Sequence, residues 1–180
     1  MAATKKIPVP VLYGAIAALG MILVTLATYY GGVDMFIGNV AYLMYLFPIA
    51  LAVVGALVQK KVNGGILGFQ DALKACFGVI VLALAVQTLF TWILVRFIDP
   101  RFGQALPAAV LAKTEATFRR FGVPEDEISK TLAEEKGKDP FSLGRMLTGL
   151  ARNYIVGFPV AVLLAAIIGQ RLVAGRGPKA

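Results

Sequence analysis

The side chains best able to do chemistry in this chain stand at the borders of long apolar runs. Asp71 and Lys74 lie three residues apart in the stretch GGILGFQDALKACF, a spacing that brings an acid and a base together on one helix face. Asp34 and Asp99 occupy two further borders. The chain has no histidine, which removes the commonest general base and metal ligand, and its single cysteine cannot form an internal disulfide. Nothing in the spacing pairs the three carboxylates, so we predict a non-enzymatic protein with no catalytic residue, cofactor or metal.

The stretch around Asp71 also has a mechanical interpretation. Its glycines let the chain turn between two apolar runs, and Asp71 would lie in the first turn of a helix, where a negative charge is favourable. Lys74, one turn later, would pair with Asp71 or extend toward lipid phosphate. We therefore predict a hinge rather than a site, formed by Gly64, Gly65, Gly68, Asp71 and Lys74.

The apolar runs place these residues at membrane boundaries. Hydrophobic residues make up 58% of the 180 residues, and the mean hydropathy is +0.77. A hydrocarbon core of about 30 Å is crossed by about 20 apolar helical residues. Three runs reach this length, and a fourth, Asn153 to Gln170, is shorter and is extended by Gly149 to Arg152. We predict an all-α integral membrane protein with four transmembrane helices. The predicted spans are 9–30, 36–59, 72–97 and 150–172, within a single membrane domain covering residues 1–180.

Charge predicts the orientation of these spans. If both termini face the cytoplasm, the inner side carries eight basic residues and one acid, Asp71, whereas the outer side carries ten basic residues and nine acids. Basic residues in short loops favour the cytoplasmic side, so we predict an N-in, C-in topology. The net charge of +8 then reflects topology and anionic lipid, and we expect no nucleic-acid partner. The inner basic residues are Lys5, Lys6, Lys60, Lys61, Lys74, Arg171, Arg176 and Lys179.

Two patterns inside the spans are candidates for packing or binding. Small residues recur every fourth position in the last span, and such a stripe is typical of close helix packing, within one bundle or across a homodimer. No charged residue lies near the middle of a span, which argues against a proton-coupled transporter. Polar side chains in the third span would hydrogen-bond between helices or line a cavity. The candidate packing residues are Gly157, Ala161, Ala165 and Gly169, and the candidate polar cavity consists of Gln87, Thr88 and Thr91.

Residues 99–149 form one sizeable polar segment, on the predicted outer side. Pro107 is expected to open a first short helix through Phe121, and Pro124, followed by three acids, to open a second. Both helices would be amphipathic and too short to be stable alone, so they must pack on each other, on the spans or on the lipid interface. This segment offers the largest surface for a protein partner.

The landmarks of the chain resemble those of a known family. They are GGILGFQDALK before the third span, RFIDPRF at its exit and GVPEDEI in the polar segment. The chain resembles the bacterial membrane proteins of domain-of-unknown-function family 4199. The resemblance implies a four-span protein of the Gram-negative inner membrane and implies no reaction. The residues that carry it are Phe69, Ala72, Leu73, Lys74, Phe97, Ile98, Asp99, Pro100 and Phe102.

Two functions fit these observations. The first is an accessory or scaffold subunit of a membrane complex, whose partners are the bilayer and other membrane subunits or a second copy, with the outer segment as binding surface. The alternative is a small oligomeric transporter or lipid-handling protein, in which Gln87, Thr88 and Thr91 line a cavity.

Overall fold

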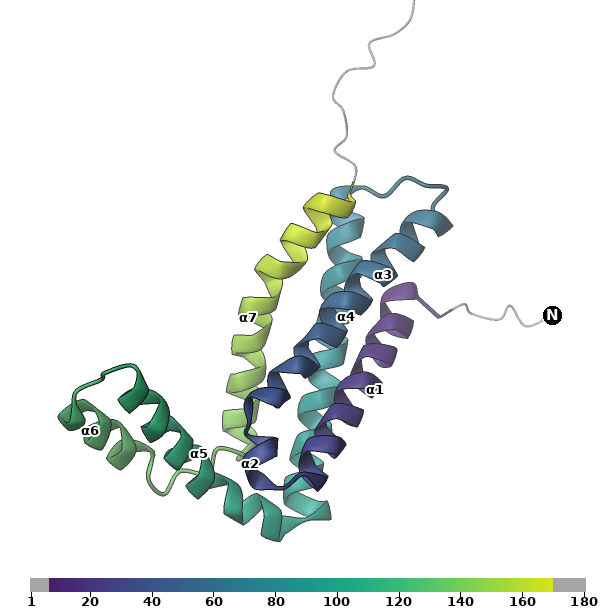
Figure 1. Cartoon of the computed structure of the whole chain (residues 1–180). Helices are drawn as coiled ribbons and strands as arrows, with labels where there is room; N and C mark the ends of the chain where they lie inside the picture. Colours follow the sequence, from purple (N-terminus) through teal and green to yellow (C-terminus); the bar gives the residue numbers. More distant parts are fainter. Residues whose placement is uncertain (1–6, 170–180) are drawn as a thin grey trace, which may run out of the picture.

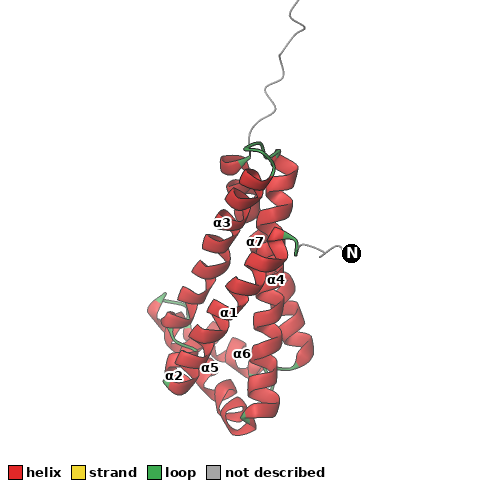
Figure 2. Cartoon of the chain, turned by 90° about the vertical axis from the view of Figure 1, so that its right-hand side faces the viewer, coloured by secondary structure: helices red, strands yellow, loops and turns green. Residues whose placement is uncertain are grey.

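A computed structural model of the chain describes residues 7–169, and the regular elements in that range are helices joined by loops, without a β-strand (Figures 1 and 2). The all-α fold predicted from the sequence is confirmed. The elements are α1 (Val9–Tyr30), α2 (Val33–Phe36), the 3₁₀ helix η1 (Asn39–Tyr45), α3 (Leu46–Val62), α4 (Phe69–Ile93), the π-helical turn η2 (Leu94–Ile98), α5 (Pro100–Arg120), α6 (Glu125–Glu135) and α7 (Leu143–Ile168).

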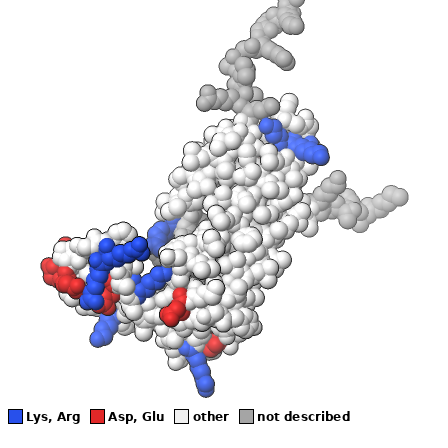
Figure 3. All heavy atoms as spheres, viewed as in Figure 1, with Lys and Arg blue, Asp and Glu red and all other residues white. Residues whose placement is uncertain are grey.

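Four helices are long and apolar enough to cross a membrane, as predicted: Val9–Tyr30, Tyr42–Val62, Phe69–Ile98 and Leu143–Ile168. They pack side by side, with α4 between α1, α3 and α7 (Figure 1). The α5–α6 hairpin extends to one side at the end of the bundle where α1 ends and α7 begins, which we call the hairpin end. The opposite end, where α3 turns into α4, is the hinge end. Charged side chains gather over the hairpin and near both ends, and the surface between them is largely uncharged (Figure 3).

The centre of the bundle is built from small side chains. Ala17, Ala52, Ala72 and Ala83 are fully buried, and large apolar side chains such as Leu23 point outward. Small residues let helix backbones approach closely, which supplies van der Waals packing where lipid removes any hydrophobic driving force between helices. An apolar exterior around a small-residue core is the arrangement that a bilayer favours, and the chain is a multi-pass membrane protein.

The second span differs from its predicted limits. Residues 39–45 form a 3₁₀ helix, and α3 begins only at Leu46. Pro48 therefore lies in the first turn of α3, just after the change from 3₁₀ to α-helix, where its fixed φ is compatible with a helix. Lys60 and Lys61 fall in the last turn of α3, and α3 ends at Val62.

The last span begins earlier than the sequence predicted. α7 starts at Leu143 rather than residue 150, because the segment around Arg145 and Arg152 continues the helix. Pro159 lies inside α7, and the helix runs on past it. The predicted end at residue 172, and the basic residues Lys5, Lys6, Arg171, Arg176 and Lys179, lie outside the described residues.

The polar segment forms a longer hairpin than predicted. α5 begins at Pro100, and Pro107 lies within it, so the prediction of a helix opening at Pro107 was wrong. The cause is Asp99, whose side chain accepts the Phe102 N–H and caps the helix seven residues earlier. α6 begins at Glu125, and the acids Glu125, Asp126 and Glu127 occupy its first turn.

Candidate functional site

The predicted hinge forms a tight turn between α3 and α4. Gly64 and Gly65 have φ angles of 74° and 89°, which side-chain-bearing residues rarely adopt, and the Gly65 N–H donates to the Lys60 carbonyl. Asp71 lies in the first turn of α4, and its carboxylate is 3.8 Å from the Lys74 ammonium, with both side chains largely exposed. Gly68 immediately precedes α4.

Other contacts fix this end of the bundle. Leu67, in the turn between α3 and α4, is buried in the core. The Lys60 ammonium donates to the Ile168 carbonyl, so it ties the end of α3 to the last turn of α7. Cys76 is also buried, beside the Ala52 carbonyl.

The small-residue stripe of α7 packs inside the chain's own bundle. Ala161 and Ala165 are fully buried. A Cβ added at Gly157 would lie 3.1 Å from Ile80, and one added at Gly169 would lie 3.1 Å from the Cα of Phe69, both on α4. The stripe therefore brings α7 close to α4.

Gln87 is the most deeply buried side chain of the predicted polar cavity, at 5% exposure. Its amide nitrogen donates to the Thr25 hydroxyl of α1 and, at 3.1 Å, to the Thr91 hydroxyl one turn along α4. The Thr25 hydroxyl in turn donates a hydrogen bond to the Met21 carbonyl. Thr88 is half-buried and does not join this cluster. The Gln87 amide oxygen has no partner within residues 7–169. This arrangement links α1 to α4.

The pattern of hydrogen bonds predicts that Gln87→Leu will be tolerated. Leucine fills similar space, Thr25 keeps its bond to Met21, and the unpartnered amide oxygen is removed. Because hydrogen bonds between membrane helices contribute only about 0.6 kcal/mol on average, the free energy of unfolding in a detergent titration should fall by less than about 1 kcal/mol. A loss of several kcal/mol would show that the Gln87 amide forms a stabilising hydrogen bond to a group other than Thr25 and Thr91.

Two joints hold the α5–α6 hairpin on the bundle, and the first is centred on Asp99. The Tyr29 hydroxyl donates to one carboxylate oxygen at 2.9 Å, and the Phe102 N–H donates to the other at 3.0 Å. These two donors, the Phe102 N–H first, hold the pKa of Asp99 below its usual range. The Phe102 ring packs edge-on against Tyr29 and Phe36, with ring centroids 4.8 and 5.2 Å away. Both oxygens of the Asp99 carboxylate are therefore engaged: one caps α5, and the other anchors α5 to α1.

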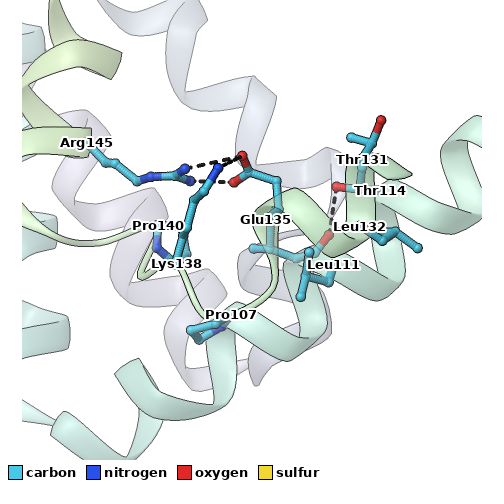
Figure 4. Close-up of a pocket in the computed structure, with 10 residues that line it drawn as sticks. Pro107, Leu111, Thr114, Thr131, Leu132, Glu135, Lys138, Pro140 and Arg145 are labelled. Carbon is cyan, nitrogen blue, oxygen red and sulfur yellow. Dashed lines mark hydrogen bonds and ion pairs between the residues drawn. The ribbon is translucent and has the colours of Figure 1, made fainter. Parts of the chain in front are cut away.

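The second joint connects the end of α6 to the start of α7. The Arg145 guanidinium donates two hydrogen bonds to the Glu135 carboxylate, of 2.6 and 3.2 Å, and the Lys138 ammonium lies 3.2 Å from the same carboxylate (Figure 4). Together they lower the pKa of Glu135 to about 2, the Arg145 bond having the largest effect. A small hollow of about 100 Å³, bordered by Pro107 and Leu132, lies beside this cluster.

The second joint should respond to acid. Because the pKa of Glu135 is lowered on docking, its contribution is complete above the ordinary carboxyl value of 4.5 and is lost as the pH falls toward about 2. Paired spin labels at Lys130 and Thr148, in a Cys76→Ala background, should report one narrow distance at pH 7 that broadens below pH 4.5. Glu135→Gln should broaden it already at pH 7. An unchanged distance for this variant would mean that the ion pairs do not position α6.

A third feature of the hairpin is the outward face of α5. α6 covers the face that bears Val110 and Leu111, and the Lys113 ammonium on another face donates to the Ile37 carbonyl near the bundle. The remaining face is exposed and consists mainly of alanines. They are Ala105, Ala108, Ala112 and Ala116.

The structure does not assemble the carboxylates that sequence reasoning considered for catalysis. Asp71 lies at the hinge end, whereas Asp34 is exposed on α2 and Asp99 caps α5. No group of three or more Cys, Asp and Glu side chains within residues 7–169 could hold a metal ion.

Comparison with known proteins supplies the family. One family profile, described as "Protein of unknown function (DUF4199)", matches residues 12–170. The chain belongs to this family. The match extends from the first span to the end of the last, so it includes the hairpin and both of its joints. No curated protein and no solved structure shows a significant match to the chain.

Sequence reasoning missed the two joints and the alanine face. Asp99 followed by Pro100 is a signal for a capped helix start, and it could have located α5 correctly. The partners of Asp99 and Glu135 carry no comparable signal, because Tyr29 is 70 residues from Asp99 and ion pairs do not follow a periodic pattern.

Proposed function

We propose that this DUF4199 chain is a non-enzymatic accessory or scaffold subunit of a bacterial inner-membrane complex, with both termini in the cytoplasm and α5 as the surface for its partner. The observation that carries the proposal is the exposed alanine face of α5. Small side chains let a second helix approach closely, and this face lies outside the four spans, so a helix of another subunit could reach it.

Charge defines the partner further. Arg101 and Arg120 are exposed at the two ends of α5, before and after the alanines. A partner helix that carries acidic residues near both ends and apolar residues between them would complement this surface. The two joints support this use of the hairpin, because they fix α5 relative to the bundle and so lower the entropic cost of binding.

Ala112→Trp tests the proposal, because a bulky ring on the alanine face would keep a partner helix at a distance. In pull-downs from native membranes of the source cell, recovery of the partner should fall about tenfold or more, the size expected when a well-packed contact is lost. Ala133→Trp places the same ring on the exposed side of α6 and serves as the control. Equal recovery by both variants and the wild type would refute α5 as the binding surface.

A lipid-handling role is the second candidate, and a different observation favours it. An apolar crevice of about 180 Å³ lies between α3, α4 and α7, lined in part by Pro48, Leu84 and Val160. Its size and lining suit an acyl chain better than a polar solute. Gln87, Thr88 and Thr91 do not line this crevice.

A further inference from the structure

A second hollow lies on α7 close to the second joint. It measures about 370 Å³ and is lined by Pro140, Arg145, Thr148, Gly149 and Arg152. The two arginines are seven residues apart, so they lie on the same side of α7 two turns from each other. Thr148 and Gly149 between them are small. Basic side chains are visible where the hairpin meets the bundle (Figure 3).

Both arginines have donors to spare. Arg145 uses two of its five N–H groups on Glu135. Arg152 is exposed and forms no ion pair with any residue between 7 and 169. The hydroxyl of Thr148 donates to the Gly144 carbonyl, so the guanidinium groups are the donors that face the hollow. No acidic residue lines it, so an anion would meet the Arg152 cation and the remaining N–H donors of Arg145, whose charge is shared with Glu135.

The depth of Arg152 places this hollow at the surface of the bilayer. Arg152 precedes the end of α7 at Ile168 by 16 residues, or about 24 Å of helix, slightly less than the hydrocarbon thickness of about 30 Å. Its long side chain would extend from there to the headgroup layer. Ile155 and Val156, about one turn deeper than Arg152, are exposed and apolar, so α7 faces lipid tails directly below the hollow.

The apolar crevice lies next to the hollow and deeper along α7, because Arg152 lines the hollow and the following residue, Asn153, lines the crevice. Val156 borders the crevice, and it lies on the same side of α7 as Arg145, because eleven residues make about three full turns. The deeper wall is formed by Gly157 and Val160 of α7 and by Pro48 and Ile49 of α3. A cationic hollow at headgroup depth therefore adjoins an apolar crevice at acyl-chain depth.

We propose that this corner is a binding site for one anionic phospholipid of the bilayer, with the phosphate between Arg145 and Arg152 and an acyl chain in the crevice between α3 and α7. The guanidinium groups hold the phosphate oxygens through charge-assisted hydrogen bonds. A zwitterionic lipid fits less well, because its cationic group would meet the same arginines. This site is separate from the alanine face of α5 and does not depend on a protein partner there.

Native mass spectrometry of the full chain in mild detergent tests the proposal. The protein is titrated with dioleoylphosphatidylglycerol or with dioleoylphosphatidylcholine. We expect the anionic lipid to bind at least tenfold more tightly, and Arg152→Gln to weaken its binding roughly tenfold, as for the loss of a hydrogen bond to a charged group. Arg120→Gln removes the same charge from an exposed position on α5 and should leave binding unchanged.

Two further arms identify the source of the phosphate and the role of the crevice. Inorganic phosphate at the lipid concentrations used should not displace the anionic lipid, because it lacks an acyl chain. Val156→Trp fills the mouth of the crevice from an exposed position and should weaken lipid binding with both arginines intact, which keeps the test valid if Arg152→Gln fails to fold. Equal binding of the two lipids, displacement by phosphate, or equal losses from Arg152→Gln and Arg120→Gln would overturn the proposal.

Discussion

Gly103→Ala is expected to release the hairpin from the bundle while leaving the four spans folded. A Cβ at this position would lie 2.3 Å from the Val95 carbonyl oxygen in η2, a backbone atom that cannot rotate away. α5 would have to move off η2, and the Asp99 cap and the packing of Phe102 would be lost with it. Overpacking of this kind costs about 1–3 kcal/mol.

Trypsin cleavage after Arg101 measures this release, because Arg101 lies in the first turn of α5 and is cut only when that turn opens. A destabilisation of about 2 kcal/mol should raise the cleavage rate roughly 30-fold. Gly144→Ala is the matched control, since nothing lies within 4 Å of a Cβ at that helical position. Similar rates for the two variants would show that α5 does not pack tightly on η2.

Gly14→Leu is expected to destabilise the bundle itself. A Cβ at Gly14 of α1 would lie 3.0 Å from both Cβ and Cδ2 of Leu82 on α4, and leucine adds three more carbons in the same direction. α1 and α4 form the most extensive helix pair in the structure, so their separation would disturb the centre of the fold. The free energy of unfolding should fall by about 3 kcal/mol or more.

Unfolding in a mixed detergent titration, followed by the fluorescence of Trp92, measures this loss. Gly144→Leu provides the contrast, because it makes the same change on an exposed helix face and replaces a poor helix former. It should be neutral or slightly stabilising. If Gly14→Leu unfolded at the same denaturing-detergent midpoint as the wild type, that result would contradict the close approach of α1 to α4 at Gly14.

Hydropathy predicted the four spans because the bilayer imposes a single length on every crossing helix. It located their ends less well. Nothing in the apolar run 36–59 indicates that its first part is a 3₁₀ helix. The earlier start of α7 was missed because the uncharged run begins only at residue 153, whereas Arg145 and Arg152 lie within the helix and can extend to the headgroups.

The hairpin shows where sequence reasoning has too little information. Asp99-Pro100 and Pro107 both signal a helix start, and the Asp99 cap on the Phe102 N–H decides for the earlier one. The anchoring of that cap by Tyr29, in another span, carries no sequence signal. The alanine face was equally hidden, since alanine is compatible with burial and with exposure alike. Which face of α5 is free depends on α6 and on Lys113, which are long-range contacts.

Site-specific photocrosslinking in native membranes tests most directly whether α5 binds a partner. A photoreactive phenylalanine analogue is placed at Ala112 on α5 or at Ala133 on α6, one position at a time. We predict that position 112 crosslinks to one membrane protein, that position 133 does not, and that adding Ala116→Trp abolishes the product from position 112. If position 112 gave no protein product, or gave one that Ala116→Trp left unchanged, α5 would not be the partner surface.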